Sequence, residues 1–327
     1  MDMIGQTVFQ VIIGLIASIS SAGCALLYFR RVRLERPPVG TFNNRDIIII
    51  VVFIITLPLL YLVLPSVALT GFLILTFSSA SYIALRPLMR LRYLWPLIIL
   101  LIVVNIVVTE TLLGTRQGWQ VYWVLTSAIV LIAVVGISNL YVQGGMRLRH
   151  IAWFALFLAC YDFFFTVIIP LTPRLADRFE GQPLDPSIGF TIGVYNANLG
   201  IGDLLVFSLF MIAAYKGFGR RGAIAGFIII ALFGGIVPEV SPLLITAFIR
   251  TNIGIVIPVQ TFFGPAAFIT YFVLARTGPE RSMAQWTSAE VAAGRKPIRA
   301  LRQRQRARLA TAGSIQPAAG TGANQAG

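Results

Sequence analysis

The chain has 327 residues, of which 57% are hydrophobic and only 12% charged, and its formal net charge is +14. Its apolar stretches reach the roughly 18 residues that cross a bilayer, so the composition predicts a polytopic membrane protein and excludes a water-soluble domain with its own core. The single histidine, His150, lies beside two arginines at the end of an apolar stretch. This argues against zinc-protease and Ser-His-Asp chemistry, which depend on imidazoles, and no cofactor or metal is expected.

In chain order, the hydropathy pattern predicts an all-α fold with nine transmembrane helices, all within residues 1–276. The first helix follows Met-Asp-Met without a basic leader, which is typical of a retained span. The segment 241–249 is apolar but too short to cross alone. It could extend the eighth helix, lie at the outer surface or re-enter the membrane. The nine expected spans are 8–29, 47–64, 67–85, 93–113, 121–142, 151–171, 188–215, 223–240 and 253–275.

The distribution of Lys and Arg predicts the orientation of these spans. With the N-terminus outside, the cytoplasmic segments would hold all but four of the 26 basic residues. The exceptions are Arg116, Arg174, Arg178 and Arg250. An odd number of spans places the basic C-terminal tail inside, so we expect an outside N-terminus and a cytoplasmic C-terminus.

Residues 277–327 are expected to form a basic, disordered cytoplasmic tail. Its stretch from Arg295 to Arg308 is polybasic, and such a stretch just inside a membrane is attracted to anionic lipid. An orientation-fixing solvated tail is the simpler interpretation. Nucleic-acid binding is not expected, because topology explains most of the positive charge.

Two acidic residues lie deep within predicted spans: Asp162 and Asp203. At a rise of 1.5 Å per residue they are about 17 and 19 Å from the inner boundary, on consecutive antiparallel helices. Acids at this depth are unfavourable by about 2.5–3.5 kcal/mol each, so they usually have a function or a partner. We therefore expect the two carboxylates to share one site.

Two carboxyl groups held close together in an apolar medium cannot both ionise easily, so the pair would share a proton. One could then act as a base and the other as an acid during attack of water on a peptide carbonyl. Gly200 and Gly202 leave room beside Asp203 for a substrate backbone or a partner helix. Asn196 and Asn198 could hydrate the site or make polar contacts between helices. Glu239 is expected at the outer surface, with a role in the substrate pathway as the alternative.

These residues resemble the motifs of intramembrane aspartyl proteases, the presenilin and signal peptide peptidase family. Tyr161-Asp162 resembles the YD motif, and Gly200-Ile201-Gly202-Asp203 resembles the GxGD motif. Pro265-Ala266-Ala267 in the last span resembles the PAL motif, with Ala in place of Leu at the third position. The resemblance implies a presenilin-like fold and catalytic roles for Asp162 and Asp203. It also implies a substrate-adjacent Pro265, for which an ordinary helix kink is the alternative, while Tyr161 could either orient the site or only pack.

Within this family, the orientation and the short segment 172–187 resemble signal peptide peptidases more than presenilin. The resemblance implies a single-chain enzyme without obligatory accessory subunits that cuts transmembrane helices or remnant signal peptides. The chain has no N-x-Ser/Thr sequon and no retention signal at Gly327, which fits a prokaryotic cell membrane.

Two other functions fit the same acid pair. A proton-coupled transporter or channel also places acids and broken helices at the membrane midplane. A non-catalytic relative could instead retain membrane helices without cutting them.

Overall fold

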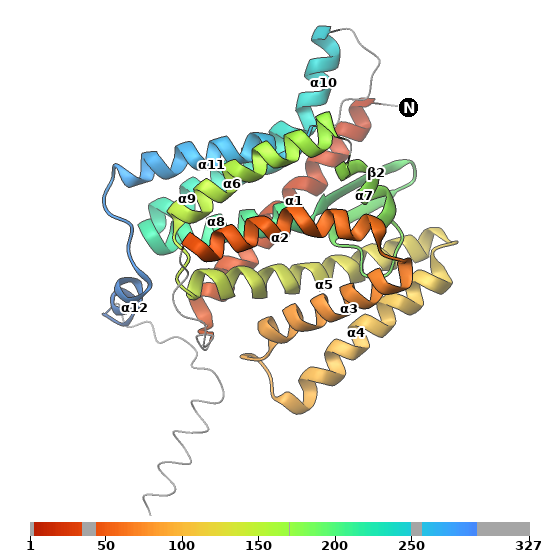
Figure 1. Ribbon diagram of the computed structural model, residues 1–327, viewed down its shortest axis with the longest axis horizontal. Helices are drawn as coiled ribbons and strands as arrows, with labels where there is room; N and C mark the ends of the chain where they lie inside the picture. Colours follow the sequence, from red (N-terminus) through yellow and green to blue (C-terminus); the bar gives the residue numbers. More distant parts are fainter. Residues whose placement is uncertain (1–2, 35–43, 170, 250–256, 293–327) are drawn as a thin grey trace, which may run out of the picture.

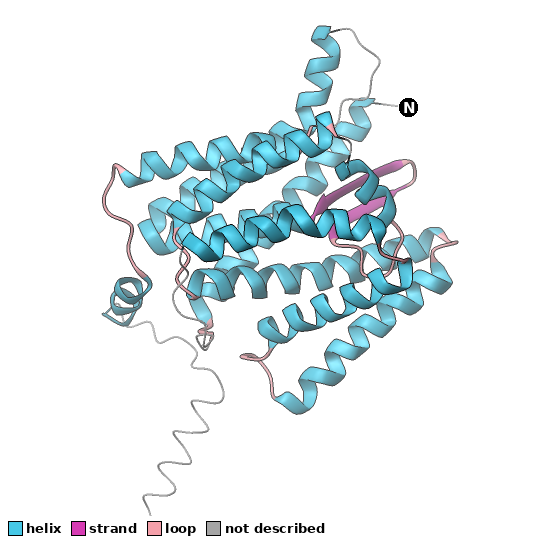
Figure 2. Cartoon of the chain, viewed as in Figure 1, coloured by secondary structure: helices cyan, strands magenta, loops and turns pink. Residues whose placement is uncertain are grey.

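The computed structural model describes residues 3–34, 44–169, 171–249 and 257–292, and most of them are helical (Figures 1 and 2). Seven helices are long and apolar enough to cross a membrane, which identifies an integral membrane protein. They are Ile4–Arg31, Ser66–Leu85, Leu91–Leu112, Arg116–Gln143, Leu148–Ile168, Ile201–Phe218 and Arg220–Ile245. Two shorter apolar helices, Ile48–Val63 and Val259–Ala275, coincide with the other two expected spans. The structure therefore supports a polytopic membrane protein with seven membrane-length helices among the described residues, and the count of nine spans stays a prediction.

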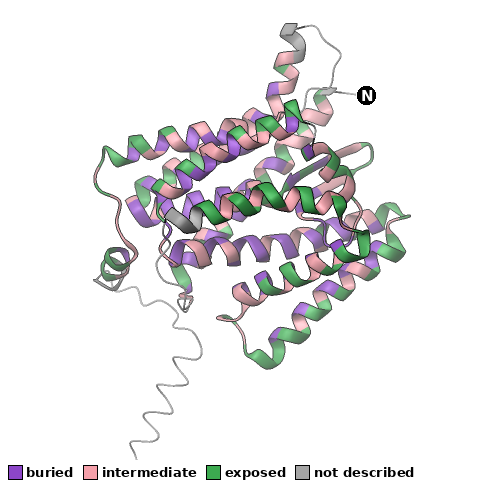
Figure 3. Ribbon diagram, in the orientation of Figure 1, coloured by how far each residue is buried: buried purple, intermediate pink, exposed green. Residues whose placement is uncertain are grey.

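The first five helices, α1 to α5, have bounds close to those expected. They are α1 (Met3–Arg31), α2 (Asn44–Val63), α3 (Ser66–Leu85), α4 (Leu91–Leu112) and α5 (Arg116–Gln143). The outer faces of α2, α3 and α4 are exposed (Figure 3), and their exposed side chains are mostly aliphatic, as a lipid-facing surface requires.

The helix α8 (Ile201–Phe218) is at the centre of the molecule. In the most apolar 18-residue stretch of α8, 67% is buried inside the protein, compared with 28% in the corresponding stretch of α4. It packs against α1, α5 and α9 (Arg220–Ile229), and also against α6 (Leu148–Phe163). Because α8 begins at Ile201, Asp203 is in its first turn and is held by the most buried helix of the fold.

The expected span 188–215 is helical only in its second half. Residues before Ile201 form an antiparallel hairpin of β1 (Ser187–Ile192) and β2 (Tyr195–Gly200). Gly193 has φ +61°, as the first residue of a tight two-residue hairpin turn requires. Gly189 is needed where β1 meets α5, since a Cβ there would lie 2.8 Å from the Trp123 ring. The prediction of one continuous helix was wrong, because hydropathy alone does not separate a buried strand from a buried helix.

Two stretches of π-helix interrupt the later spans. One, η1 (Phe164–Ile168), follows α6 directly after Asp162 and leads to α7 (Leu171–Phe179). The other, η2 (Ile230–Ile236), joins α9 to α10 (Val237–Ile249), so 241–249 extends the eighth helix. Figure 1 shows α10 projecting from the bundle beside the start of α1. Such π-helical turns are frequent at functional sites.

The last two helices are α11 (Val259–Ala275) and α12 (Met283–Ala292). Trp286 of α12 is buried against the Phe29 ring at 4.6 Å, with the Arg33 guanidinium 4.0 Å from its ring centroid. Glu280, between the two helices, accepts hydrogen bonds from the Leu148 and Arg149 backbone amides at the start of α6. The first part of the expected disordered tail is thus ordered on the bundle, and residues 293–327 lie outside the described residues.

The close contact of α6 with α11 depends on Gly264. A Cβ at this position would lie 2.4 Å from the Ala155 carbonyl oxygen and 2.7 Å from the Ala159 Cβ. Figure 1 shows the two helices side by side. Their backbones can approach this closely only because position 264 has no side chain.

We expect Gly264→Ala to lower the thermal stability of the purified protein by about 1–3 kcal/mol, since it overpacks a backbone contact. Unfolding in detergent, followed by circular dichroism, measures this. Gly23→Ala in α1 is the matched control, because a Cβ there meets nothing within 4 Å. Equal stability of the two variants would contradict the close approach.

The hairpin is anchored at Asp185, just before β1. The buried Asp185 carboxylate accepts hydrogen bonds from the Ser187 hydroxyl at 2.6 Å and the Tyr122 hydroxyl at 3.3 Å. Burial raises the pKa of Asp185 to about 6, although the hydrogen bonds from Ser187 and Tyr122 act to lower it. The folded state therefore binds this proton more tightly than the unfolded chain does.

Since the pKa of Asp185 is about 6 in the folded protein and its ordinary value is 3.8, this residue should make stability fall as pH rises from about 4 to 6. We expect Asp185→Asn, which mimics the protonated form, to flatten this part of the stability curve. Thermal unfolding between pH 4 and pH 7 measures the difference from wild type. An unchanged slope in the variant would contradict the assignment.

Candidate functional site

Asp162 and Asp203, the two acids singled out in the sequence, are brought together by the fold. Asp162 is in the last turn of α6 and Asp203 is in the first turn of α8. The two helices pack against each other, and the two half-buried carboxylates are close enough to interact electrostatically. Among the described residues, no Lys or Arg interacts with either carboxylate. No positive charge therefore helps both carboxyl groups to ionise, which favours one proton shared between them.

The glycines before Asp203 have different surroundings. Gly200 precedes the first residue of α8, and a Cβ there would lie 3.8 Å from the Asp203 Oδ2. Gly202 is exposed, and a Cβ there would meet nothing within 4 Å. Between them, Ile201 donates its backbone N–H to the Pro186 carbonyl oxygen at 2.7 Å. The motif therefore joins a strand to a helix and leaves open space beside its acid.

The strand β2 has a free edge that leads to Asp203. In an antiparallel pair, alternate residues turn both backbone groups toward the partner strand. The bond from Ile201 to Pro186 and the register of the hairpin assign Tyr195, Ala197 and Leu199 to this inward set. Asn196, Asn198 and Gly200 then direct their N–H and C=O groups away from β1.

Among the described residues, one group occupies this outer edge. Gln6 of α1 donates its side-chain N–H to the Asn196 carbonyl oxygen at 2.7 Å. The Asn196 side chain itself donates to Glu180, at 2.8 Å, and accepts from Thr191. Asn198 and Gly200 are exposed. The backbone nearest to Asp203 is therefore available for pairing with another strand.

Tyr161 contacts α2 and is also close enough to Asp162 to interact with it electrostatically. Its hydroxyl donates to the Ile54 carbonyl oxygen at 3.3 Å, and its ring lies 4.5 Å from the Phe165 ring. Of the two roles expected for Tyr161, these contacts favour packing.

Pro265, Ala266 and Ala267 lie in the interior of α11, where Ala266 and Ala267 are buried. Pro265 has no N–H to donate to the Thr261 carbonyl, as expected from the sequence. The Thr270 hydroxyl donates to the Ala266 carbonyl at 2.7 Å. The substrate-adjacent role of these three residues stays a prediction.

Gln260 was missed in the sequence. It is in the first turn of α11, 1% exposed, and its amide interacts with the Asp203 carboxylate. Neither amide atom meets the geometric criteria for a hydrogen bond to a described group. Gln260 therefore lies next to Asp203 without a well-formed hydrogen bond to it. The sequence did contain one signal for Gln260: it is a single amide residue in an apolar stretch, two positions after Pro258.

Glu239 was expected at the outer surface of the membrane, and that placement stays a prediction. It begins α10, is half-buried, and its carboxylate interacts electrostatically with Asp203. Its side chain lies against Gly14 of α1, where a Cβ would be 3.9 Å from the Glu239 carboxylate. The π-helical η2 directly before it directs α10 toward α1, which the sequence did not reveal.

The described residues contain no group of three or more His, Cys, Asp or Glu that could hold a metal ion. In comparisons with known proteins, no family model matches this chain and no curated protein is similar to it.

Proposed function

We propose that this chain is an intramembrane aspartyl protease that hydrolyses peptide bonds in membrane-spanning helices or remnant signal peptides. The observation that carries the proposal is the electrostatic pairing of Asp162 and Asp203 on adjacent helices within the membrane. The resemblance of the surrounding motifs to the presenilin and signal peptide peptidase family supports it.

The proposed mechanism uses the shared proton of the acid pair. The ionised Asp takes a proton from a water molecule, whose oxygen attacks the peptide carbonyl carbon, while the protonated Asp donates to the carbonyl oxygen. Collapse of the resulting tetrahedral species breaks the C–N bond. The amine leaves with the proton that the first Asp took from the water molecule. Gln260, beside Asp203, is positioned to orient that carboxylate.

The free edge of β2 suggests how a substrate would be presented. A helical substrate shields its carbonyls, so the segment to be cut must first unwind. Once extended, it could pair with the outward N–H and C=O groups of Asn198 and Gly200 and so reach Asp203. In the bilayer this pairing would satisfy backbone groups that have no water to bond.

We further propose nine spans with an outside N-terminus and a cytoplasmic C-terminus, in a prokaryotic cell membrane. This orientation rests on the distribution of basic residues. We propose a single-chain enzyme without obligatory accessory subunits, whose basic tail contacts anionic lipid.

The test of the function is cleavage of a membrane-embedded reporter helix by purified protein in liposomes. We expect Asp162→Asn and Asp203→Asn each to lower the cleavage rate by at least about a hundredfold, since each removes one acid–base partner. Mass spectrometry of the products measures this. Asp177→Asn, at an exposed position in α7, is the matched control and should keep wild-type activity.

Activity that survives either substitution would rule out the proposed chemistry. Proton flux driven by a pH gradient, with no peptide products, would instead identify a transporter or channel. Capture of the reporter without cleavage would identify a non-catalytic relative.

The role of the β2 edge is tested by Asn198→Pro. Because the Asn198 N–H faces away from β1, proline should leave the hairpin intact while removing one donor for the substrate. We expect kcat/KM for the reporter to fall about tenfold, the effect of one strong hydrogen bond. Asn198→Ala keeps the backbone N–H, so its kcat/KM should fall much less. Equal losses of kcat/KM in the two variants would contradict strand pairing.

A further inference from the structure

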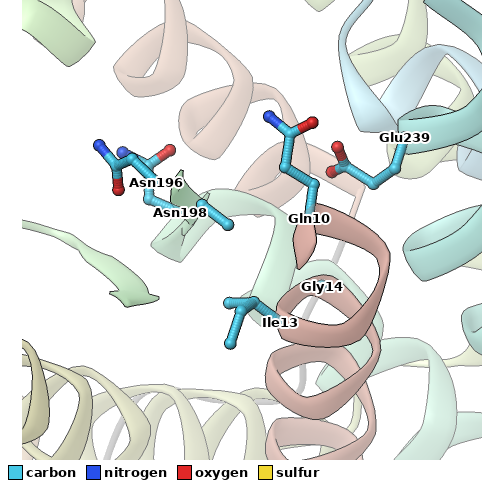
Figure 4. A pocket seen from close by; sticks show the side chains of 7 residues that line it. Gln10, Ile13, Gly14, Asn196, Asn198 and Glu239 are labelled. Atoms are coloured by element: carbon cyan, nitrogen blue, oxygen red, sulfur yellow. The ribbon is translucent and has the colours of Figure 1, made fainter. Parts of the chain in front are cut away.

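A small polar cavity lies between α1, β2 and α10 (Figure 4). Its volume is about 90 Å³, room for several water molecules or the head of one side chain. The polar groups that line it are Gln10, Asn196, Asn198 and Glu239. In Figure 4 the Gln10 and Glu239 side chains extend toward the same space from their two helices. An amide and a carboxylate thus converge there from opposite walls.

The cavity is lined by one acidic side chain and no basic one. No ion pair of Glu239 occurs among the described residues. Asp203 is close enough to interact with Glu239, and Glu180 lies on the other side of β2, bonded to Asn196. A carboxylate in such surroundings, within a membrane, is stabilised by a cation. The described residues around the cavity do not supply one.

The position of the cavity relates it to the acid pair. It lies along Asn196–Asn198 of β2, two to four residues before Gly200. At 3.4 Å per residue this is about 7–14 Å along the strand from Gly200, which is next to the Asp203 carboxylate. Gln6 already donates to the Asn196 carbonyl, so the backbone of this stretch is turned toward α1. The cavity therefore lies between this stretch of β2 and α1, close to the residue next to Asp203.

From this juxtaposition we propose that Glu239, with Gln10, forms a substrate subsite for a basic side chain, Lys or Arg, about two to four residues from the scissile bond. The proposal rests on the proposed protease function. The Glu239 carboxylate would accept hydrogen bonds from the ammonium or guanidinium, and the Gln10 carbonyl would accept another. Gly14 keeps the space open, since it has no side chain that would approach the Glu239 carboxylate.

The experiment uses the full-length protein in liposomes and a set of reporter helices. A single Lys is moved residue by residue through the five positions on each side of the cleavage site, and a matched set carries Met. We expect Lys at one of these positions to raise kcat/KM roughly tenfold over Met. Glu239→Gln should bring the ratio of kcat/KM for the Lys reporter to kcat/KM for the Met reporter close to one.

A charge exchange makes the test specific to Glu239. We expect Glu239→Lys to prefer the reporter with Glu at the same position, reversing the wild-type order. Glu110→Gln, at an exposed position in α4, is the matched control and should keep the wild-type preference. A Lys preference that is absent in wild type or unchanged in Glu239→Gln would overturn the subsite.

Measuring how tightly the reporters bind separates failure of the protease function from failure of the subsite. Fluorescence anisotropy measures the affinity of the same labelled reporters for the Asp203→Asn protein, which keeps the cavity. Lys-dependent binding that Glu239→Gln abolishes would support the subsite even if no reporter is cut. Cleavage that depends on both aspartates, with no dependence on Lys in rate or affinity, would support the protease and overturn the subsite.

Discussion

The constraint on which the rest of this structure depends is the placement of acidic side chains within an apolar slab. Each carboxylate is unfavourable there unless protein groups surround it. Asp203 meets this condition because it begins α8, the most buried helix, between α1, α5 and α6. Asp162 meets it because α6 packs against both α8 and α11. The position of the acids thus explains why α8 is central and why α6 and α11 approach so closely at Gly264.

The hairpin before α8 raises a second problem, since a membrane has no water to satisfy the edge of a sheet. Fewer backbone N–H and C=O groups of the hairpin are left exposed because α5 packs against β1 and α1 packs against β2. The Gln6 side chain bonds one outward carbonyl, and Asn196 and Asn198 add polar groups along the strand. The outward groups of Asn198 and Gly200 have no such cover, and they are the ones closest to Asp203. Incomplete satisfaction at this point is the feature that a strand-binding function would use.

Glu239 is a third carboxyl group close to the acid pair. Its carboxylate comes from a different part of the chain than Asp162 and Asp203, and the π-helical η2 directs it to the cavity beside β2. Glu239 and Gln260 thus add a carboxyl group and an amide next to Asp203, each from a helix other than the two that carry the acid pair.

By itself, the sequence determined the class of protein, the approximate bounds of most helices and the two aspartates. These follow from hydrophobicity over 20-residue stretches and from the rarity of acids within them, both of which are local properties. It did not determine the hairpin at 187–200, because an apolar run of that length fits either a strand or a helix until its neighbours are known. The one local signal was Gly193 between two short polar-apolar alternations.

Only the tertiary structure placed Gln260 and Glu239 beside Asp203. Both are single polar residues in apolar stretches near prolines, and their surroundings are set by how α10 and α11 pack against α1 and α8. The same holds for Trp286, which fixes part of the expected tail to the bundle through contacts with Phe29 and Arg33. Contacts between residues that are 36 to 257 positions apart depend on packing geometry, which no local pattern in the sequence records.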